Sequence, residues 1–389
     1  MIAAVVLAGG RSRRFGADKL RQLVDGRELL DLTISQLPAG TEVVVVGSDT
    51  PGGPAAALVA GLERALALAP DAIVVLPGDA PQAGQAAAEL LARLVAAAVE
   101  AVVAIDPDGR EQPLQLALRP AAAAGLVRAA GRSGAVDASA RALISVLHAT
   151  PHPLSAAAVF DIDTPDQLRT WELRTSPAVE RILAWVGLPD GEKSRKTAGS
   201  GALIDATFRD FSALGGAALG GVAIDGPSGG GKSTLAGALA LRTRCVVVAG
   251  DDFYNPALSG EHPPEWADSE IADQAFDWRR LRSEAIEPLL AGRPARYAPY
   301  DWAARDGSLA SPRTLAPAPL VVLEGVYSSR PELADLVDLH VFVGIEPTER
   351  QTRLDARAGD ARAWQEFWER GERYYFTRVR PPEFFDLQL

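Results

Sequence analysis

The sequence contains very little cysteine and lysine and carries no excess of positive charge. Cys245 is the single cysteine among 389 residues, so an intrachain disulfide and a cysteine-rich metal site are both excluded. Acidic residues (50) outnumber basic residues (39), and the resulting net charge of -11 argues against a nucleic-acid partner or an anionic membrane surface. An anionic ligand would therefore have to be held by a local group of residues.

Long hydrophobic runs are also lacking. The apolar start of the chain offers about seven apolar residues, too few to span a bilayer. It is followed by Arg11, Arg13 and Arg14, an order that does not fit a signal peptide. Hydrophobic residues make up 48% and charged residues 23%, which is typical of globular domains, whereas aromatic residues reach only 6%. We expect a cytoplasmic protein of two or three domains, with cores built mainly from Ala, Val and Leu.

The first half alternates short apolar runs with patterns of helical spacing. Helices are predicted over Ala55–Leu68 and Gln85–Val99. The alternation predicts a mostly parallel sheet with helices on both faces. The predicted strands are Ala3–Leu7, Glu42–Gly47, Ala72–Leu76, Ala101–Ile105 and Ala158–Ile162.

The pattern changes near residue 175. Val179, Ile182, Leu183 and Val186 predict a short amphipathic helix, and the small, polar run 191–201 predicts an exposed linker. A second alternation follows, in which a helix is expected over Leu235–Leu241. Its predicted strands are Val222–Ile224, Val246–Ala249, Leu320–Leu323, His340–Val343 and Phe384–Leu389.

These patterns predict two doubly wound, mostly parallel-sheet α/β domains, which we place at residues 1–175 and 220–389. A short helix and a flexible linker would join them over residues 176–219.

A phosphate-binding loop is predicted directly after the first strand. Adjacent glycines let the backbone turn and bring its N–H groups to phosphate oxygens, while Arg14 and Lys19 can neutralise a triphosphate. Asp79 ends a later strand at the sheet edge where open α/β sheets bind ligands, although a carboxylate there can also serve only as a helix cap. The residues expected to contact the nucleotide are Leu7, Ala8, Gly9 and Gly10.

The spacing from Leu7 to Lys19 resembles the signature of the MobA-like molybdenum cofactor guanylyltransferases. The segments Leu76–Pro81, Gln112–Leu114 and Phe160–Pro165 resemble this family too. The resemblance implies a Rossmann-like nucleotidyltransferase fold and Mg²⁺-dependent transfer of GMP or CMP from GTP or CTP to molybdopterin. It implies Arg14, Lys19 and Asp79 as catalytic residues. Molybdoenzyme maturation proteins would be expected partners.

The second contact to that Mg²⁺ would come from Asp161 or Asp163, and Asp161 is slightly favoured. Asp79 would supply the first contact. The base of the nucleotide stays open between guanine and cytosine. A sugar phosphate or another alcohol phosphate also remains open as the acceptor.

The strongest motif is Gly226–Thr234, which satisfies the pattern G-x-x-x-x-G-K-[ST] between a predicted strand and a predicted helix. Backbone amides would hold the phosphates, Lys232 would reach the outer ones, and Ser233 could ligate Mg²⁺. Glu324, at the end of a later strand, could order the water shell of this ion. The expected nucleotide contacts are Gly226, Ser228, Gly229, Gly230, Gly231, Lys232, Ser233 and Thr234.

Downstream residues suggest an acceptor for the phosphoryl group. Asp251 follows the second strand of this half, where a carboxylate can deprotonate a hydroxyl group. Aromatic residues lie beside acids at Asp277 and Trp302, although aromatics of this kind usually belong to a core. Arginines, including Arg350 and Arg353, run through a predicted helix and loop that suit a phosphoryl-transfer lid.

Together these residues resemble the uridine kinase-like P-loop kinases. The resemblance implies a kinase that uses ATP and phosphorylates a nucleoside-like small molecule, with Asp251 as general base. It implies a ribose contact at Asp277 and acceptor-site residues at Tyr254, Trp302, Arg350 and Arg353. The base-reading histidine expected after Tyr300–Trp302 is not evident, so uridine itself is a doubtful acceptor. A non-catalytic GTP-binding adaptor is the alternative for this half.

Overall fold

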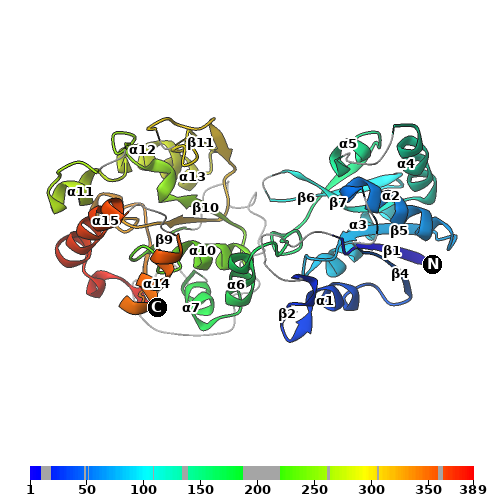
Figure 1. Cartoon of the computed structure of the whole chain (residues 1–389), viewed down its shortest axis with the longest axis horizontal. Helices are drawn as coiled ribbons and strands as arrows, with labels where there is room; N and C mark the ends of the chain where they lie inside the picture. Colours follow the sequence, from blue (N-terminus) through cyan, green and yellow to red (C-terminus); the bar gives the residue numbers. More distant parts are fainter. Residues whose placement is uncertain are drawn as a thin grey trace. The chain divides into compact units, whose positions relative to one another are not determined.

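The computed structural model describes residues 1–9, 19–47, 50, 52–107, 109–133, 139–186, 220–260, 263–304, 306–357 and 362–389. The chain divides into two compact units, Met1–Glu172 and Leu173–Leu389 (Figure 1). Each unit is built on its own β-sheet with helices on both faces, so each is described by itself.

The first unit contains a six-stranded sheet in the order β4-β1-β5-β7-β6-β8. All neighbouring strands are parallel except β7, which runs antiparallel to both β5 and β6. The elements are β1 (Ile2–Leu7), η1 (Lys19–Arg21), β2 (Leu23–Val24), β3 (Arg27–Glu28), α1 (Leu29–Ser35), β4 (Thr41–Val46), α2 (Gly53–Leu66), β5 (Ala72–Pro77), α3 (Ala83–Ala96), β6 (Ala101–Ile105), β7 (Glu111–Leu118), α4 (Pro120–Ser133), α5 (Ala140–Ile144), β8 (Thr150–Pro153) and α6 (Pro165–Leu173).

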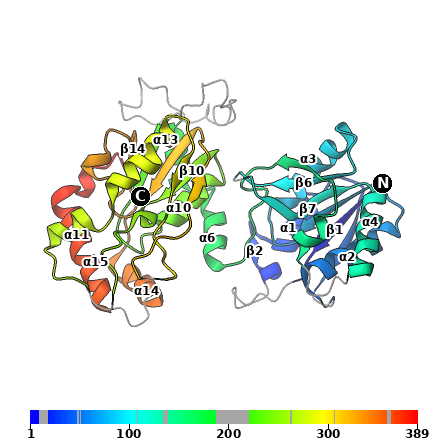
Figure 2. The same ribbon diagram turned by 90° about the horizontal axis from the view of Figure 1, so that it is seen from above.

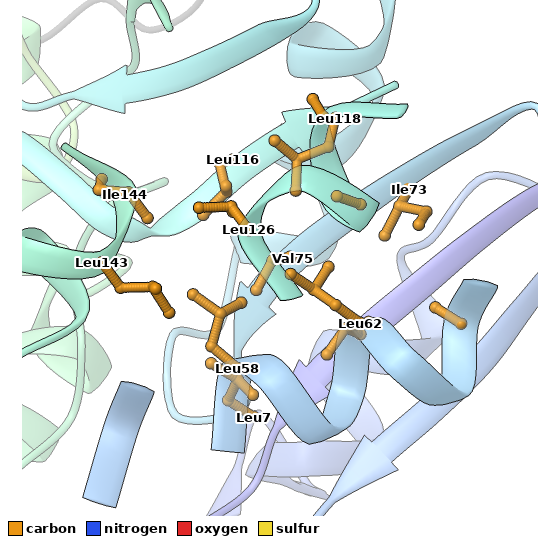
Figure 3. Close-up of a cluster of buried hydrophobic side chains, with 14 of the residues drawn as sticks. Leu7, Leu58, Leu62, Ile73, Val75, Leu116, Leu118, Leu126, Leu143 and Ile144 are labelled. Carbon is orange, nitrogen blue, oxygen red and sulfur yellow. The ribbon is translucent and has the colours of Figure 1, made fainter. Parts of the chain in front are cut away.

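The core of this unit lies on both faces of the sheet because successive strand residues point to opposite sides. Val5 and Leu7 of β1 pack with α2, α4 and α5, whereas Ala4 packs on the opposite face with α3. Figure 3 shows Leu58 and Leu62 of α2 beside Ile73 and Val75 of β5. The near-continuous apolar runs of β1 and β5 are therefore explained by burial on both sides.

Most predicted elements of this half exist with small shifts of their ends. The prediction of β6 as Ala101–Ile105 is confirmed residue for residue. The strand predicted over Ala158–Ile162 is wrong, because these residues form a turn and an extended connection. Their backbone bonds to the Gln115 side chain and to the carbonyl of Asp79 instead of to a strand.

Strand β7 was not predicted, and it is what makes the sheet mixed. A hairpin joins β6 to β7, with the amide of Asp106 donating to the carbonyl of Arg110 at 2.9 Å. The Asp106 carboxylate accepts hydrogen bonds from the amide of Arg110 and from the Gln112 side chain. The chain thus reverses through a short polar turn and needs no crossover helix there.

The second unit contains a five-stranded, fully parallel sheet in the order β10-β13-β9-β14-β15. A two-stranded antiparallel ribbon, β11-β12, stands apart from it. The elements are α7 (Pro177–Val186), β9 (Gly220–Asp225), α10 (Lys232–Ala240), β10 (Cys245–Ala249), η3 (Gly250–Phe253), α11 (Asp268–Gln274), α12 (Trp278–Arg280), η4 (Leu281–Ile286), α13 (Glu287–Leu290), β11 (Ala295–Tyr297), β12 (Arg313–Leu315), β13 (Leu320–Glu324), η5 (Pro331–Leu333), β14 (Leu339–Phe342), α14 (Pro347–Arg357), α15 (Arg362–Tyr374), η6 (Tyr375–Val379), η7 (Pro382–Phe384) and β15 (Leu387–Gln388).

The amphipathic helix predicted over residues 179–186 is present as α7, and it belongs to the core of the second unit. Its Val179, Ile182 and Leu183 pack with α10 against β9, β13 and β14. Helix α13 and η4 cover the opposite face. Figure 2 shows the helices of this unit on both sides of its sheet. The linker predicted over 191–201 lies outside the described residues.

Across the described part of the chain, no helix combines the length and apolar character needed to cross a membrane.

The contact between α1 and α3 leaves room for glycine only. A Cβ added at Gly84 would lie 2.0 Å from the carbonyl oxygen of Thr33, whereas one added at Gly125 in α4 would meet nothing within 4 Å. We expect Gly84→Ala to lower the free energy of unfolding of the first unit by about 1–3 kcal/mol through overpacking. Gly125→Ala should be neutral or stabilising by about 0.5–1 kcal/mol. Urea denaturation of both variants, followed by circular dichroism, tests this, and equal midpoints would contradict it.

Candidate functional sites

The carboxyl ends of β1 and β5 form the first candidate site. Beyond the end of β1, the amide of Ala8 donates to the carbonyl of Val46 at 2.8 Å, and the amide of Gly78 donates to the carbonyl of Leu7 at 3.0 Å. These bonds fix the start of the predicted phosphate loop beside the end of β5. Gly9 is exposed there. Arg14 and Gly10 lie outside the described residues.

Three aspartates lie close together at this edge. Asp79 follows β5, and the amide of Ile162 donates to its carbonyl at 2.9 Å, which holds the segment 161–163 beside it. The Ile162 side chain is fully buried and anchors this segment. The aspartates on either side of it, Asp161 and Asp163, are therefore brought to Asp79 by a backbone hydrogen bond and one apolar anchor.

Lys19 joins two of these carboxylates. Its ammonium contacts Asp79 Oδ2 at 2.5 Å and also donates to Asp163 Oδ1. Burial would lower the pKa of the Lys19 ammonium, but the attraction of Asp79 and Asp163 outweighs it, and the pKa is raised. Burial raises the pKa of Asp161, and the negative charges of Asp163 and Asp79 raise it further. The site thus contains more negative charge than its lysine alone compensates.

This donor set suits Mg²⁺, which prefers carboxylate and phosphate oxygens and usually keeps several waters. Among the residues that the structure describes, no three His, Cys, Asp or Glu side chains are arranged as a metal cluster by themselves. The ion would therefore have to complete its coordination with phosphate oxygens and water. Asp79 with Asp161 or Asp163 could supply the protein ligands. Between the last two, only Asp163 bonds to Lys19.

The second candidate site is the turn between β9 and α10, the glycine-rich loop (residues 226–231). Gly226 has φ +145°, and a Cβ there would lie 2.3 Å from the carbonyl oxygen of Val343. Gly231, at φ +94°, forms the N-cap of α10 in the left-handed region that favours glycine. The loop thus leads directly into a helix N-terminus, the arrangement that binds phosphate through backbone amides.

Lys232, Ser233 and Glu324 meet at the carboxyl ends of β9 and β13. The Lys232 ammonium donates to the carbonyl of Pro227 at 3.0 Å, and the Ser233 hydroxyl donates to Glu324 Oε2 at 3.0 Å. Burial, with the nearby charge of Asp251, raises the pKa of Glu324 to about 7. A buried carboxylate beside a hydroxyl and a second acid suits Mg²⁺ held jointly with phosphate oxygens.

An aromatic cluster lies next to Asp251. The ring of Tyr254 lies 4.8 Å from those of Tyr300 and Trp302 and 5.1 Å from that of Trp368. The indole N–H of Trp302 donates to the carbonyl of Asp251 at 3.1 Å. Tyr254 is 5% exposed and Trp302 46% exposed, so the first is a core residue and only the second presents a face to solvent.

The side chains of the other predicted acceptor residues bond to the protein itself, although Asp277 stays beside the cluster because its amide donates to the carbonyl of Phe253 at 2.7 Å. The Asp277 carboxylate caps α12 by accepting from the amide of Arg280 at 3.1 Å. Arg350 and Arg353 donate to the carbonyls of Ser228 and Gly229 at 3.0 and 2.9 Å, on the glycine-rich loop and not in the aromatic cluster. Contacts of these three residues with an acceptor stay predictions.

Sequence reasoning missed the buried carboxylate of Asp225. It accepts from the amides of Gly226, Tyr327 and Ser329 and from the hydroxyl of Tyr375. Burial raises its pKa to about 6, although the amides of Ser329 and Gly226 oppose the rise. Its position directly before the first glycine of the motif was the only local signal. Apart from Gly226, its partners come from parts of the chain more than a hundred residues away.

One comparison with known proteins identifies a domain in the first unit. Residues 4–150 match the family model described as MobA-like NTP transferase domain. The N-terminal unit therefore carries an NTP transferase domain, a nucleotide-binding module whose members use nucleoside triphosphates with Mg²⁺. A comparison with curated proteins returned no similar sequence.

Three solved structures show partial likeness. The molybdopterin-guanine dinucleotide biosynthesis protein A from Archaeoglobus fulgidus is 19% identical, with a TM-score of 0.35, over 44% of this chain and 96% of its own. A possible uridine kinase from Bacillus stearothermophilus is 24% identical, with a TM-score of 0.34, over 48% and 96%. The 4-diphosphocytidyl-2C-methyl-D-erythritol synthase from Anaerococcus prevotii is 15% identical, with a TM-score of 0.32, over 43% and 94%.

The raised pKa of Glu324 predicts a pH-dependent stability. The folded chain keeps this proton up to about pH 7, whereas the unfolded chain loses it near the ordinary value of 4.5. Unfolding therefore releases a proton in this window, and the stability falls as the pH rises through it. In EDTA and without nucleotide, Glu324→Gln should remove on the order of 2 kcal/mol of this fall.

Thermal unfolding between pH 5 and pH 8 measures the effect. Glu366→Gln on α15 is the control, since the Glu366 side chain is 66% exposed and its variant should keep the pH slope of the native chain. A slope that is the same in all three proteins would contradict the expectation.

Proposed function

We propose that the N-terminal unit transfers GMP or CMP from a nucleoside triphosphate to a molybdopterin-type cofactor. The supporting observation is Lys19 held between Asp79 and Asp163 at the carboxyl edge of the sheet. Lys19 and Asp79 lie within the matched NTP transferase segment, and Asp163 follows it. Molybdoenzyme maturation proteins are the partners that such a product suggests.

In this proposal a phosphate oxygen of the acceptor forms a bond to the α-phosphorus while the bond to pyrophosphate breaks. Bound Mg²⁺ would neutralise charge on the triphosphate oxygens. Lys19 would hold the phosphates, and its two carboxylate partners fix the position of its ammonium. Asp79 and one of its neighbours would hold the ion. Positioning and charge neutralisation, and not covalent participation of the protein, would carry the reaction.

For the C-terminal unit we propose an ATP-dependent kinase that acts on a nucleoside-like alcohol. Its supporting observation is the glycine-rich loop, which runs from β9 into the N-terminus of α10 with Lys232 and Ser233 in the first turn. Asp251 would take the proton of the acceptor hydroxyl as its oxygen bonds to the γ-phosphorus and ADP leaves. Trp302 offers an exposed ring beside Asp251 for a planar acceptor.

Nucleotide binding by the two sites can be separated in the full chain. We expect GTP or CTP with Mg²⁺ to stabilise the protein by about 2.7 kcal/mol at a hundred times its dissociation constant. Lys19→Ala should abolish this stabilisation, because the variant removes the cation between Asp79 and Asp163. Thermal-shift measurements with GTP, CTP, ATP and UTP provide the test.

Lys232→Ala is the matched control. It should keep the effect of GTP or CTP and lose that of ATP, because Lys232 belongs to the second candidate site and not to the first. If neither GTP nor CTP shifts the native protein, the molybdopterin proposal fails.

The kinase is distinguished from a GTP-binding adaptor by Asp251→Asn. Removal of a general base should lower the rate of acceptor phosphorylation by about 10²–10⁴-fold, with little change in ATP affinity. Phosphate transfer from labelled ATP to a panel of nucleosides measures this. An unchanged rate would remove the general-base role, and hydrolysis of nucleotide without any phosphorylated acceptor would favour the adaptor.

A further inference from the structure

A triad of one buried and two half-buried residues holds the glycine-rich loop from the side of α14 and α15. It consists of Ser228 on the loop, Glu372 on α15 and Arg350 on α14. The Glu372 carboxylate accepts from the amide of Ser228 at 3.2 Å and from its hydroxyl, and it contacts Arg350 Nη2 at 2.8 Å. Arg350 Nε donates to the carbonyl of Ser228 at 3.0 Å, which closes the triad.

The arginines of α14 orient the peptide groups of the loop. The carbonyl of Ser228 points to Arg350 and that of Gly229 points to Arg353. In a trans peptide the N–H points opposite to the C=O, so the amide that follows Ser228, that of Gly229, is directed away from α14. The amide of Gly230 donates to the carbonyl of Pro227 at 3.0 Å and closes the turn. The guanidinium groups of Arg350 and Arg353 thus help to hold the peptide groups of Ser228 and Gly229 in their orientations.

Helix α15 gives Glu372 a fixed position. It lies beside α11 in both views (Figures 1 and 2), and a Cβ at Gly371 would lie 2.4 Å from Ile271 Cγ2. Just beyond its end, the Tyr375 hydroxyl donates to Asp225 at 2.9 Å, at the entrance of the loop. Glu372 is only 4% exposed, although charged side chains are almost never so buried unless they are paired. The packing of α15 therefore holds the Glu372 carboxylate in the position where it bonds to Ser228 and Arg350.

From this geometry we propose that Glu372 is a positioning residue of the nucleotide site. It holds Ser228 and the guanidinium fork of Arg350 so that the loop amides are preorganised for a polyphosphate. The inference rests on the proposed binding of ATP at this loop. In this proposal Arg350 fixes the conformation of the loop. The alternative is that Arg350 only supplies positive charge to the phosphates.

The test uses the full chain and isothermal titration with MgATP and with inorganic tripolyphosphate. We expect Glu372→Gln to weaken both ligands on the order of tenfold, because the closer charged partner of Arg350, which also bonds to Ser228, is lost. Glu369 approaches Arg350 only at 3.8 Å and does not bond to the loop. If Arg350 acted by charge alone, releasing it from Glu372 would tighten binding. Unchanged or tighter binding therefore overturns the proposal. Glu366→Gln, an exposed change on the same helix, should bind like the native chain.

Arg350→Lys provides a second measurement that keeps the charge and removes only the planar fork. We expect it to lose affinity as Arg350→Ala does, whereas affinity equal to that of the native protein overturns the proposal. This variant decides the matter if Glu372→Gln does not fold, since it leaves the buried carboxylate with a cationic partner. Failure of the native chain to bind either ligand would instead reject the nucleotide site itself.

Discussion

Both units depend on the parallel pairing of one buried strand with a neighbour on each side. Strand β1 pairs with β4 and β5, and β9 pairs with β13 and β14. Because the carboxyl ends of parallel strands share one edge, residues that are distant in sequence meet there. The amide of Gly78, next to Asp79, thereby bonds to the carbonyl of Leu7, and Glu324 meets Ser233. Disrupting the pairing of β1 or of β9 would therefore move the groups of the corresponding site apart, even if each side chain were unchanged.

The two sites compensate negative charge differently. In the first, one ammonium lies between two carboxylates, and a third acid keeps a raised pKa. In the second, the glycine-rich loop supplies backbone dipoles, and its single lysine donates to a carbonyl of the same loop. The chain has only four lysines, and these two stand at the candidate sites, so an overall charge of -11 conceals two cationic positions. Local arrangement, and not bulk composition, determines where an anion can bind.

Most of the fold was predictable because both sheets are built from short apolar runs separated by helical patterns. Buried strands such as β5 and β13 can be recognised from their nearly continuous apolar residues. Strand β7 was missed because Gln112 and Pro113 interrupt its apolar pattern, and residues 158–162 were misread because an apolar run can also be an anchored connection.

The places of the candidate site residues in the fold were predictable where a motif is contiguous in sequence. Lys19, Asp79, Lys232 and Ser233 stand in such segments, and the structure places each at the expected sheet edge. The triad partner Glu372 could not be predicted, since it reaches Ser228 across 144 positions through the packing of α15 alone. Asp277 stands in a segment singled out from the sequence, but in the structure its carboxylate caps a helix, and its contact with an acceptor stays a prediction.

The antiparallel strand β7 also leaves the first sheet electrically uneven along its carboxyl edge. Beside β4 and β5 the chain continues into α2 and α3, whose N-termini carry partial positive charge. Beside β6 it turns back through the hairpin of Asp106 and Arg110, which has no helix dipole. The part of the edge beside β4 and β5 thus favours anions because of its helix N-termini. The part beside β6 lacks this contribution, so its polarity depends on its side chains. The residues of these two parts can therefore change independently of each other.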